Sequence, residues 1–416
     1  MQMLHLNGVN TIGPFTDNGQ NYIVHAAVTL KATACPRCKH GLLYEFGDRA
    51  IRVIDLPIHG KQVLINLDRK RYRCRKCKHT FMPAHPEIDS EFRLTTRAVK
   101  WIEKESMRQT FAYISNQIGI DEITVRRVFW RYAQNREKTL SPTAGRIIGI
   151  DELYLLSEFR CIVANLEDHT VIDLLKDRDR RRVQRYLKDL DGVKDVERVC
   201  IDMWRPYRDA VKEVMPGVPI TVDKFHVLKW ANHTMEQIRK DTQRKLERGK
   251  KLDLMRSRHI LLRRKPNLDK QELAKIKRWR RTYPALIDAW ELKEQFFNIY
   301  DQPSSEAARE AFKQWRVDLP LTVHHQFKEL VNMVNNWEEE IFNYFDERVT
   351  NAFTECANGL AKITNRTGRG HSFAVIRFKV LFAHRLEAFK RRSIRSRMAV
   401  MGVPFSTFDD PLDFEP

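Results

Sequence analysis

The sequence has no long apolar run and few cysteines, and each absence narrows the class of protein. No stretch of about 18 apolar residues is present, which excludes a membrane-spanning helix. The first residues have neither the basic start nor the apolar core of a signal peptide. No internal repeat or long low-complexity segment occurs, which argues against a repeat architecture. We therefore expect a cytoplasmic protein with no membrane partner.

Acidic residues are scarce relative to basic ones. The chain has 74 Lys and Arg against 54 Asp and Glu, a net charge of +20 and a sequence pI near 9.7. Such an excess favours a polyanionic partner, most simply nucleic acid, although a merely soluble basic protein is the alternative. With 416 residues, 42% of them hydrophobic, the chain has room for about two to four domains with real cores.

Four of the seven cysteines form two Cys-x-x-Cys pairs, Cys35 with Cys38 and Cys74 with Cys77. Two such knuckles present four thiolates to one structural zinc ion, whereas free or redox-active thiols are the alternative. The segment 39–73 is longer than the usual spacing of a zinc ribbon, but alternating apolar residues predict that strands fill it. We expect a zinc-binding β module within residues 1–88. The remaining cysteines lie in apolar or helical runs and are expected to be buried: Cys161, Cys200 and Cys356.

Residues 89–140 are predicted to form a helix-turn-helix domain. Helical patterns cover 95–107, 111–118 and 122–133, and a turn containing Gly119 joins the last two. In a DNA reader the last helix would enter the major groove. A plain helical hairpin with a solvated basic face is the alternative. The side chains that this helix would offer to DNA are Thr124, Arg126, Arg127 and Arg131.

Three acidic residues in separate contexts predict a metal site. Asp151 and Asp202 end apolar, strand-like runs, and Glu355 lies on one face of a predicted helix with Asn358 and Lys362. Carboxylates brought together repel one another by about 4 kcal/mol per pair at roughly 4 Å and an effective dielectric of about 20. Bound cations would relieve this repulsion, and two of them can clamp a phosphate.

The order of predicted elements indicates how these acids meet. From residue 145, the pattern strand, strand, strand, helix, strand is typical of an α/β ribonuclease-H-like core, whose first and fourth strands are neighbours. Residues 145–226 would form its first part and 350–390 its second part, carrying the third acid. An all-helical insertion at 227–349 would separate them, and a tail at 391–416 would follow. Most tryptophans of the insertion should be core residues, with base stacking by one of them as the lesser alternative: Trp230, Trp279, Trp290, Trp315 and Trp337.

The joint order of these motifs resembles the ISL-three family of bacterial insertion-sequence transposases, over about residues 30 to 390. The likeness rests on the zinc knuckles, the helix-turn-helix, Ile150-Asp151-Glu152, Asp202 followed by Trp204-Arg205-Pro206-Tyr207, and Thr354-Glu355 followed by 358–362. It implies a DDE-type transposase with Asp151, Asp202 and Glu355 as catalytic acids holding two Mg²⁺ or Mn²⁺ ions. Members often carry Val-Glu-Gly at the third acid, whereas this chain has Thr354-Glu355-Cys356.

The resemblance also implies partners and supporting residues. The substrate would be double-stranded DNA, both terminal inverted repeats and target, bound by at least a homodimer in the bacterial nucleoid. Asp223 and His226 would support the acids, although a merely buried polar pair is the alternative. Further DNA contacts are expected from Lys362, Arg366 and Arg369. Two other functions fit less well: a DNA-binding regulator would not need intact acids, and a ribonuclease-H-fold nuclease would not need two DNA-reading modules.

Overall fold

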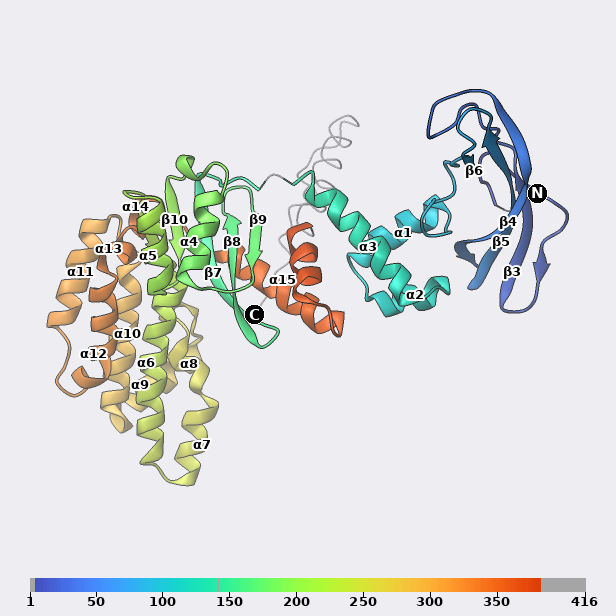
Figure 1. Cartoon of the computed structure of the whole chain (residues 1–416). Helices are drawn as coiled ribbons and strands as arrows, with labels where there is room; N and C mark the ends of the chain where they lie inside the picture. The colour runs from blue at the N-terminus through green and yellow to red at the C-terminus, as the bar shows by residue number, and fades with distance from the viewer. Residues whose placement is uncertain (1–3, 141, 383–416) are drawn as a thin grey trace, which may run out of the picture. The chain divides into compact units, whose positions relative to one another are not determined.

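The computed structural model describes residues 4–140 and 142–382, which form two compact units (Figure 1). Unit 1 comprises residues up to 140 together with 366–371, and unit 2 comprises 142–365 with 372 onward. Within these described ranges, no helix has the length and apolar character needed to cross a membrane.

Unit 1 begins with a sheet in the order β1-β3-β5-β4. β5 is its centre, pairing in parallel with β3 and antiparallel with β4. The apolar positions of residues 1–30 are too sparse to predict strands, yet three strands form there, and Leu4, Val9 and Val24 join the core of the sheet. The strands are β1 (Val9–Thr11), β2 (Thr16–Asp17), β3 (Asn21–Val28), β4 (Leu43–Ile58), β5 (Lys61–Cys74) and β6 (Thr80–Phe81).

Three helices follow the sheet in unit 1: α1 (Thr96–Ser106), α2 (Phe111–Ile118) and α3 (Glu122–Glu137). Each begins at a side chain that accepts a backbone N–H of the first turn, namely Thr95, Thr110 and Asp121. Gly119, with a φ of 76°, ends α2 in the left-handed conformation that favours glycine. The three helices therefore lie where the sequence predicts them, with the last helix one turn longer than expected.

Unit 2 contains a five-stranded sheet in the order β11-β10-β7-β8-β9. β7, β10 and β11 are parallel, whereas β7, β8 and β9 form an antiparallel meander. The strands are β7 (Ile147–Leu155), β8 (Glu158–Asn165), β9 (Thr170–Leu175), β10 (Arg198–Ile201) and β11 (Ile220–Val222). The first and fourth strands are neighbours, as the order of predicted elements requires.

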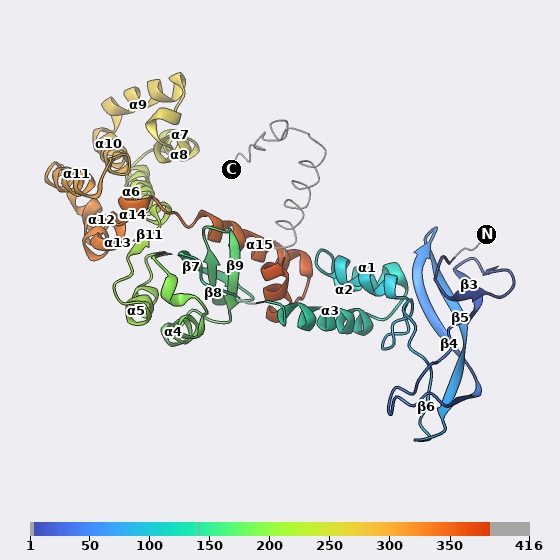
Figure 2. The same ribbon diagram turned by 90° about the horizontal axis from the view of Figure 1, so that it is seen from above.

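The two faces of this sheet carry different helices (Figure 2). Ile148 and Ile150 of β7 pack into an apolar core with α4 (Arg180–Asp189) and α5 (Arg205–Val214). Successive side chains of a strand alternate between faces. Gly149 therefore faces the other way, where α15 (Ala352–Gly368) approaches it.

All secondary-structure elements between β11 and α15 are helices. Four of the five tryptophans in this region are buried, as expected for most of them, and Trp230 on α6 is 39% exposed. Residues 373–382 are also helical; the rest of that predicted helix and the tail lie outside the described residues. The segments are α6 (Lys224–Arg244), α7 (Arg248–Arg256), α8 (Arg258–Leu262), α9 (Lys270–Thr282), α10 (Pro284–Ile299), α11 (Ser305–Val317), α12 (His324–Asn336), α13 (Glu338–Phe342) and α14 (Tyr344–Glu347), with a 3-10 turn at Lys265–Asn267. Another 3-10 turn, Val193–Asp195, lies between α4 and β10.

Candidate functional site

Each of three parallel strands leads to an aspartate, and the three aspartates lie at the same level of the sheet. Ile150 of β7 pairs with Ile201 of β10, which pairs with Val222 of β11. The next residue in each strand is an aspartate: Asp151, Asp202 and Asp223. The sequence reading of Asp151 as a strand end is wrong, because β7 continues to Leu155 by pairing with β8. Asp202 directly follows β10, and the Asp223 carboxylate caps α6 by accepting the N–H of Phe225 at 3.3 Å.

Helix α15 brings the third acid to this row. Its first turn lies directly over Gly149: a Cβ there would be 2.4 Å from Asn351 Oδ1 and 2.6 Å from Thr354 Oγ1. One turn further, Asn358 donates a hydrogen bond to Asp151 at 2.9 Å. Glu355 lies between these two contacts on the same helix face and lines one cleft with Asp151 and Asp202.

His226 links the acids into two overlapping groups. Ligand atoms of Asp151, Asp202 and His226 lie within 4.8 Å of one another, and so do those of Asp223, His226 and Glu355. His226 Nδ1 is 3.7 Å from the Asp223 carboxylate, close enough for electrostatic attraction but beyond hydrogen-bond distance. The acids thus form two subsites that share an imidazole, and Glu355 belongs with Asp223 rather than with the two aspartates of β7 and β10.

Burial and like charge set the protonation of these acids. Burial raises the pKa of Asp151 to about 7, assisted by the charges of Glu355 and Asp223. Burial and then the charge of Asp151 raise the pKa of Asp202 to about 7. Burial also raises the pKa of Glu355. Carboxyls held this way ionise fully only when a positive group offsets their mutual repulsion.

One buried carboxylate oxygen of the site has no hydrogen-bond partner among the described residues. Asp202 is 7% exposed, and no hydrogen-bond donor reaches its Oδ1 within residues 4–140 and 142–382. An unsatisfied buried carboxylate oxygen is costly. Oxygen atoms from several carboxylates are the ligands that Mg²⁺ prefers, so the donor set fits a divalent cation.

The cleft over the acids has a volume of about 420 Å³. Cationic Lys229 and Lys362 line it, and Lys362 is exposed. Three exposed aromatic side chains complete the lining: Tyr154, Phe159 and Phe225. A cleft lined by both acids and lysines suits a phosphodiester, because the lysines attract its negative charge and the acids can hold cations beside it.

Two residues of the site escape sequence reasoning. Asn358, which holds Asp151, had only its place on the face of Glu355 as a signal. Arg178, at the start of a basic run, forms an ion pair with Glu152. Its guanidinium also lies 3.9 Å from the ring centroid of Phe159 and 4.2 Å from that of Trp204. Arg178 therefore ties together the neighbours of both strand aspartates.

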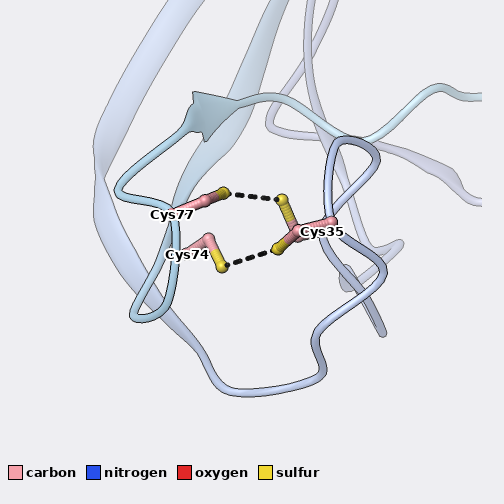
Figure 3. Close-up of side chains that lie close together, drawn as sticks. Cys35, Cys74 and Cys77 are labelled. Carbon is pink, nitrogen blue, oxygen red and sulfur yellow. Dashed lines mark hydrogen bonds between the residues drawn. The ribbon is translucent and has the colours of Figure 1, made fainter.

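The four predicted zinc ligands come together in unit 1 (Figure 3). The Sγ atoms of Cys35 and Cys77 are 3.6 Å apart, and those of Cys38 and Cys74 are also 3.6 Å apart. The backbone N–H of Cys77 is the main cause that lowers the pKa of Cys74 to about 7. Four convergent sulfurs are a donor set for tetrahedral zinc.

The other cysteines divide between core and surface. Cys161 and Cys200 are buried, as expected. Cys356 is exposed, so its predicted burial is wrong. It follows Glu355 on α15, and successive helical residues point about 100° apart, which turns Cys356 away from the packed face.

The expected DNA contacts of α3 are largely engaged within unit 1. Thr124 donates its hydroxyl to the cap residue Asp121 at 2.8 Å. The three arginines each meet a carboxylate: Arg126 that of Glu122, Arg127 that of Glu91, and Arg131 those of Asp89 and Glu91. Arg366 and Arg369 lie in the short segment that joins unit 1, and both are exposed.

Comparison with known proteins agrees with the two sites. Residues 148–380, more than half of the chain, match the model of the ISL-three (ISL3) family of DDE transposases, described as transposase. Residues 31–77 match the zinc-finger of transposase IS204/IS1001/IS1096/IS1165. A curated relative, the transposase for insertion sequence element IS1001 of Bordetella parapertussis, is 22% identical over 317 residues, 74% of this chain and 78% of the relative. The chain therefore belongs to the ISL-three family of insertion-sequence transposases.

Proposed function

We propose that Asp151, Asp202 and Glu355 are the catalytic acids of this DNA transposase and hold two Mg²⁺ or Mn²⁺ ions. The enzyme would cleave DNA strands at the terminal inverted repeats of its insertion sequence and transfer them to target DNA. The observation that carries the proposal is the unpartnered Oδ1 of Asp202 in a buried row of acids. A regulator descended from a transposase would have no need to keep such a row.

The protein groups divide the work around the reacting phosphate. Divalent cations, when bound, supply Lewis acidity that activates a water or 3′-hydroxyl and stabilises the leaving oxygen. Asn358 fixes one oxygen of Asp151. Lys362 and Lys229 at the cleft are placed to attract the phosphate backbone. His226 is close to all three acids, whereas Asp223 is grouped with His226 and Glu355. The two residues would support the acids, with His226 linking Glu355 to the aspartates.

We also infer that residues 145–226 and 350–390 make a ribonuclease-H-like core, with 227–349 as a helical insertion. Three observations support this inference. The first and fourth strands of the five-stranded sheet are paired in parallel. Helices cover both of its faces. The third acid follows a long helical segment.

In unit 1, one structural zinc ion would be held by Cys35, Cys38, Cys74 and Cys77. The zinc module and helix-turn-helix would bind the terminal repeats, with phosphate contacts supplying affinity and base-edge contacts supplying specificity. Because transposition joins two ends, at least a dimer would act, in the cytoplasm and on nucleoid DNA.

The proposal is tested with full-length protein, Mg²⁺, a plasmid target and a labelled duplex carrying one end of the insertion sequence. We expect cleavage at the boundary of the repeat and joining of the new 3′ end to the plasmid, with both products lost in a chelator. Binding of the duplex without cleavage in any divalent cation would contradict the proposal and indicate a regulator.

A further inference from the structure

The basic side chains of unit 1 differ in whether acidic residues lie near them. On α3, the arginines at 126, 127 and 131 all have carboxylate partners. Residues 31–44 and 69–86, which carry the two cysteine knuckles and the end of β5, contain no Asp or Glu at all. Their basic residues are Lys31, Arg37, Lys39, Arg69, Lys70, Arg71, Arg73, Arg75, Lys76 and Lys78.

Three of these arginines are arranged over two aromatic rings of β4. The guanidinium carbons of Arg71 and Arg73 lie 5.6 and 5.2 Å from the ring centroid of Phe46. That of Arg75 lies 5.9 Å from the ring of Tyr44. The two rings meet edge to face at 6.1 Å. We call these five residues the arginine–aromatic face.

Strand pairing explains why the face forms. Tyr44 lies directly opposite Arg73 in the β4–β5 ladder, and side chains of directly paired residues project from the same face. Phe46 lies in the irregular stretch between Glu45 and Asp48, which is opposite Arg71, and the Arg71 guanidinium contacts its ring. Stacking on a ring holds a guanidinium in place without neutralising its charge.

No carboxylate neutralises the arginines of this face among the described residues. Within the described part of unit 1, none of Arg71, Arg73 and Arg75 has a carboxylate partner, and Arg71 Nε lacks a hydrogen-bond acceptor. The nearest acid on β4, Glu45, is paired with Lys70 at 2.6 Å. The face is thus a set of guanidinium groups that are positioned by aromatic rings and can bind an external anion.

We propose that the arginine–aromatic face of the zinc module is the main phosphate-binding surface for duplex DNA in unit 1, in place of helix α3. Planar guanidinium groups bind phosphate oxygens in pairs, and the flanking knuckle lysines add charge. This inference rests on the proposed binding of DNA ends, which it assigns to a surface. Helix α3 is then left to contribute sequence discrimination rather than the bulk of the affinity.

The test is the salt dependence of DNA binding by the full chain, measured by fluorescence anisotropy without divalent cations. The probes are a labelled duplex carrying the end of the insertion sequence and an unrelated duplex of equal length. For Arg71→Gln/Arg73→Gln/Arg75→Gln, we expect the slope of log affinity against log salt to become shallower by about 2 to 3 on both duplexes. Arg75→Gln alone, at an exposed position, should change it by about 1.

The matched control removes the same charge elsewhere in unit 1. Arg52, Lys100 and Lys104 are exposed and lie off this face, and their replacement by Gln should leave the slope within about 1 of the wild type. Zinc content reports that each variant is folded. An unchanged slope in the folded triple variant would overturn the inference. If the wild-type chain binds neither duplex, the proposed binding of DNA ends itself fails.

Discussion

Asn358 on α15 donates a hydrogen bond of 2.9 Å to Asp151 on β7, across 207 positions of sequence. The second oxygen of Asp151 accepts the backbone N–H of Glu152 at 2.8 Å. The carboxylate is therefore held at both oxygens, by its own strand and by the helix that carries Glu355. The position of the third acid depends on how α15 packs on the sheet.

Gly149 should be intolerant of a side chain. In Gly149→Ala, the new Cβ would meet Asn351 Oδ1 and Thr354 Oγ1 at 2.4 and 2.6 Å, which pushes α15 away from β7. We expect a loss of about 1 to 3 kcal/mol in the free energy of unfolding and a strong loss of strand cleavage. Urea denaturation and a cleavage assay measure the two effects.

The matched control is Gly359→Ala, on α15 itself. A Cβ there meets no atom within 4 Å, and alanine favours a helix by about 1 kcal/mol over glycine. This variant should be as stable as the wild type or more so. Equal behaviour of the two variants would show that the approach of α15 to Gly149 is not what positions Glu355.

The buried acids should lower stability at neutral pH. The pKa of Asp202 is raised from 3.8 to about 7 in the fold, so the folded state holds this proton more tightly than the unfolded state. Stability is therefore lost as pH rises through that window. In metal-free buffer, the free energy of unfolding of Asp202→Asn should exceed that of the wild type by on the order of 1 to 3 kcal/mol near about pH 8, and by clearly less near about pH 5.

Thermal unfolding at both pH values measures this difference. The Asp168→Asn change, at an exposed residue that does not line the cleft, serves as control and should show little pH-dependent gain in stability. A gain for Asp202→Asn that is the same at both pH values would argue against charge repulsion as its cause.

Cleavage should depend on pH through the same acids. Asp151 and Asp202 must be ionised to hold cations, and their pKa values near 7 predict a rate that rises between about pH 6 and about pH 8. Cations compete with protons for the carboxylates, so more Mg²⁺ should shift the midpoint to lower pH. Profiles of cleavage rate against pH at two Mg²⁺ concentrations measure the shift. A midpoint that does not change with Mg²⁺ concentration would mean that other groups control the rate.

Zinc should be present and confined to unit 1. We expect metal analysis of freshly purified protein to find about one zinc per chain. Cys35→Ser/Cys74→Ser should lose it, whereas Cys356→Ser, at an exposed cysteine of α15, should retain it. Purified wild-type protein without zinc would contradict the assignment.

Features encoded in local sequence were predictable. Capping residues and Gly119 indicate the helix-turn-helix, and the two-residue spacing of the cysteines indicates a shared metal. Apolar runs place Asp151 and Asp202 on strands, and their adjacency was expected only by likeness to a ribonuclease-H-like order of elements.

Features that depend on distant pairing or unusual turns were not predictable. β3 is stabilised by parallel pairing with β5, far away in sequence. β7 continues past Asp151 into a turn at Leu156 and Ser157 with φ of 54° and 62°, residues that give no turn signal because they rarely adopt such angles. The overlap of His226 with both acid groups arises only when the strand ends and α15 meet.

We propose that the row of acids performs chemistry and is not needed for binding DNA. The most direct measurement compares Asp202→Ala with the wild type on labelled end DNA, scoring cleavage in Mg²⁺ and binding in the same samples. We predict that cleavage falls below detection while binding affinity stays within a few-fold of the wild type. Cleavage that survives in Asp202→Ala would contradict the assignment of the active site.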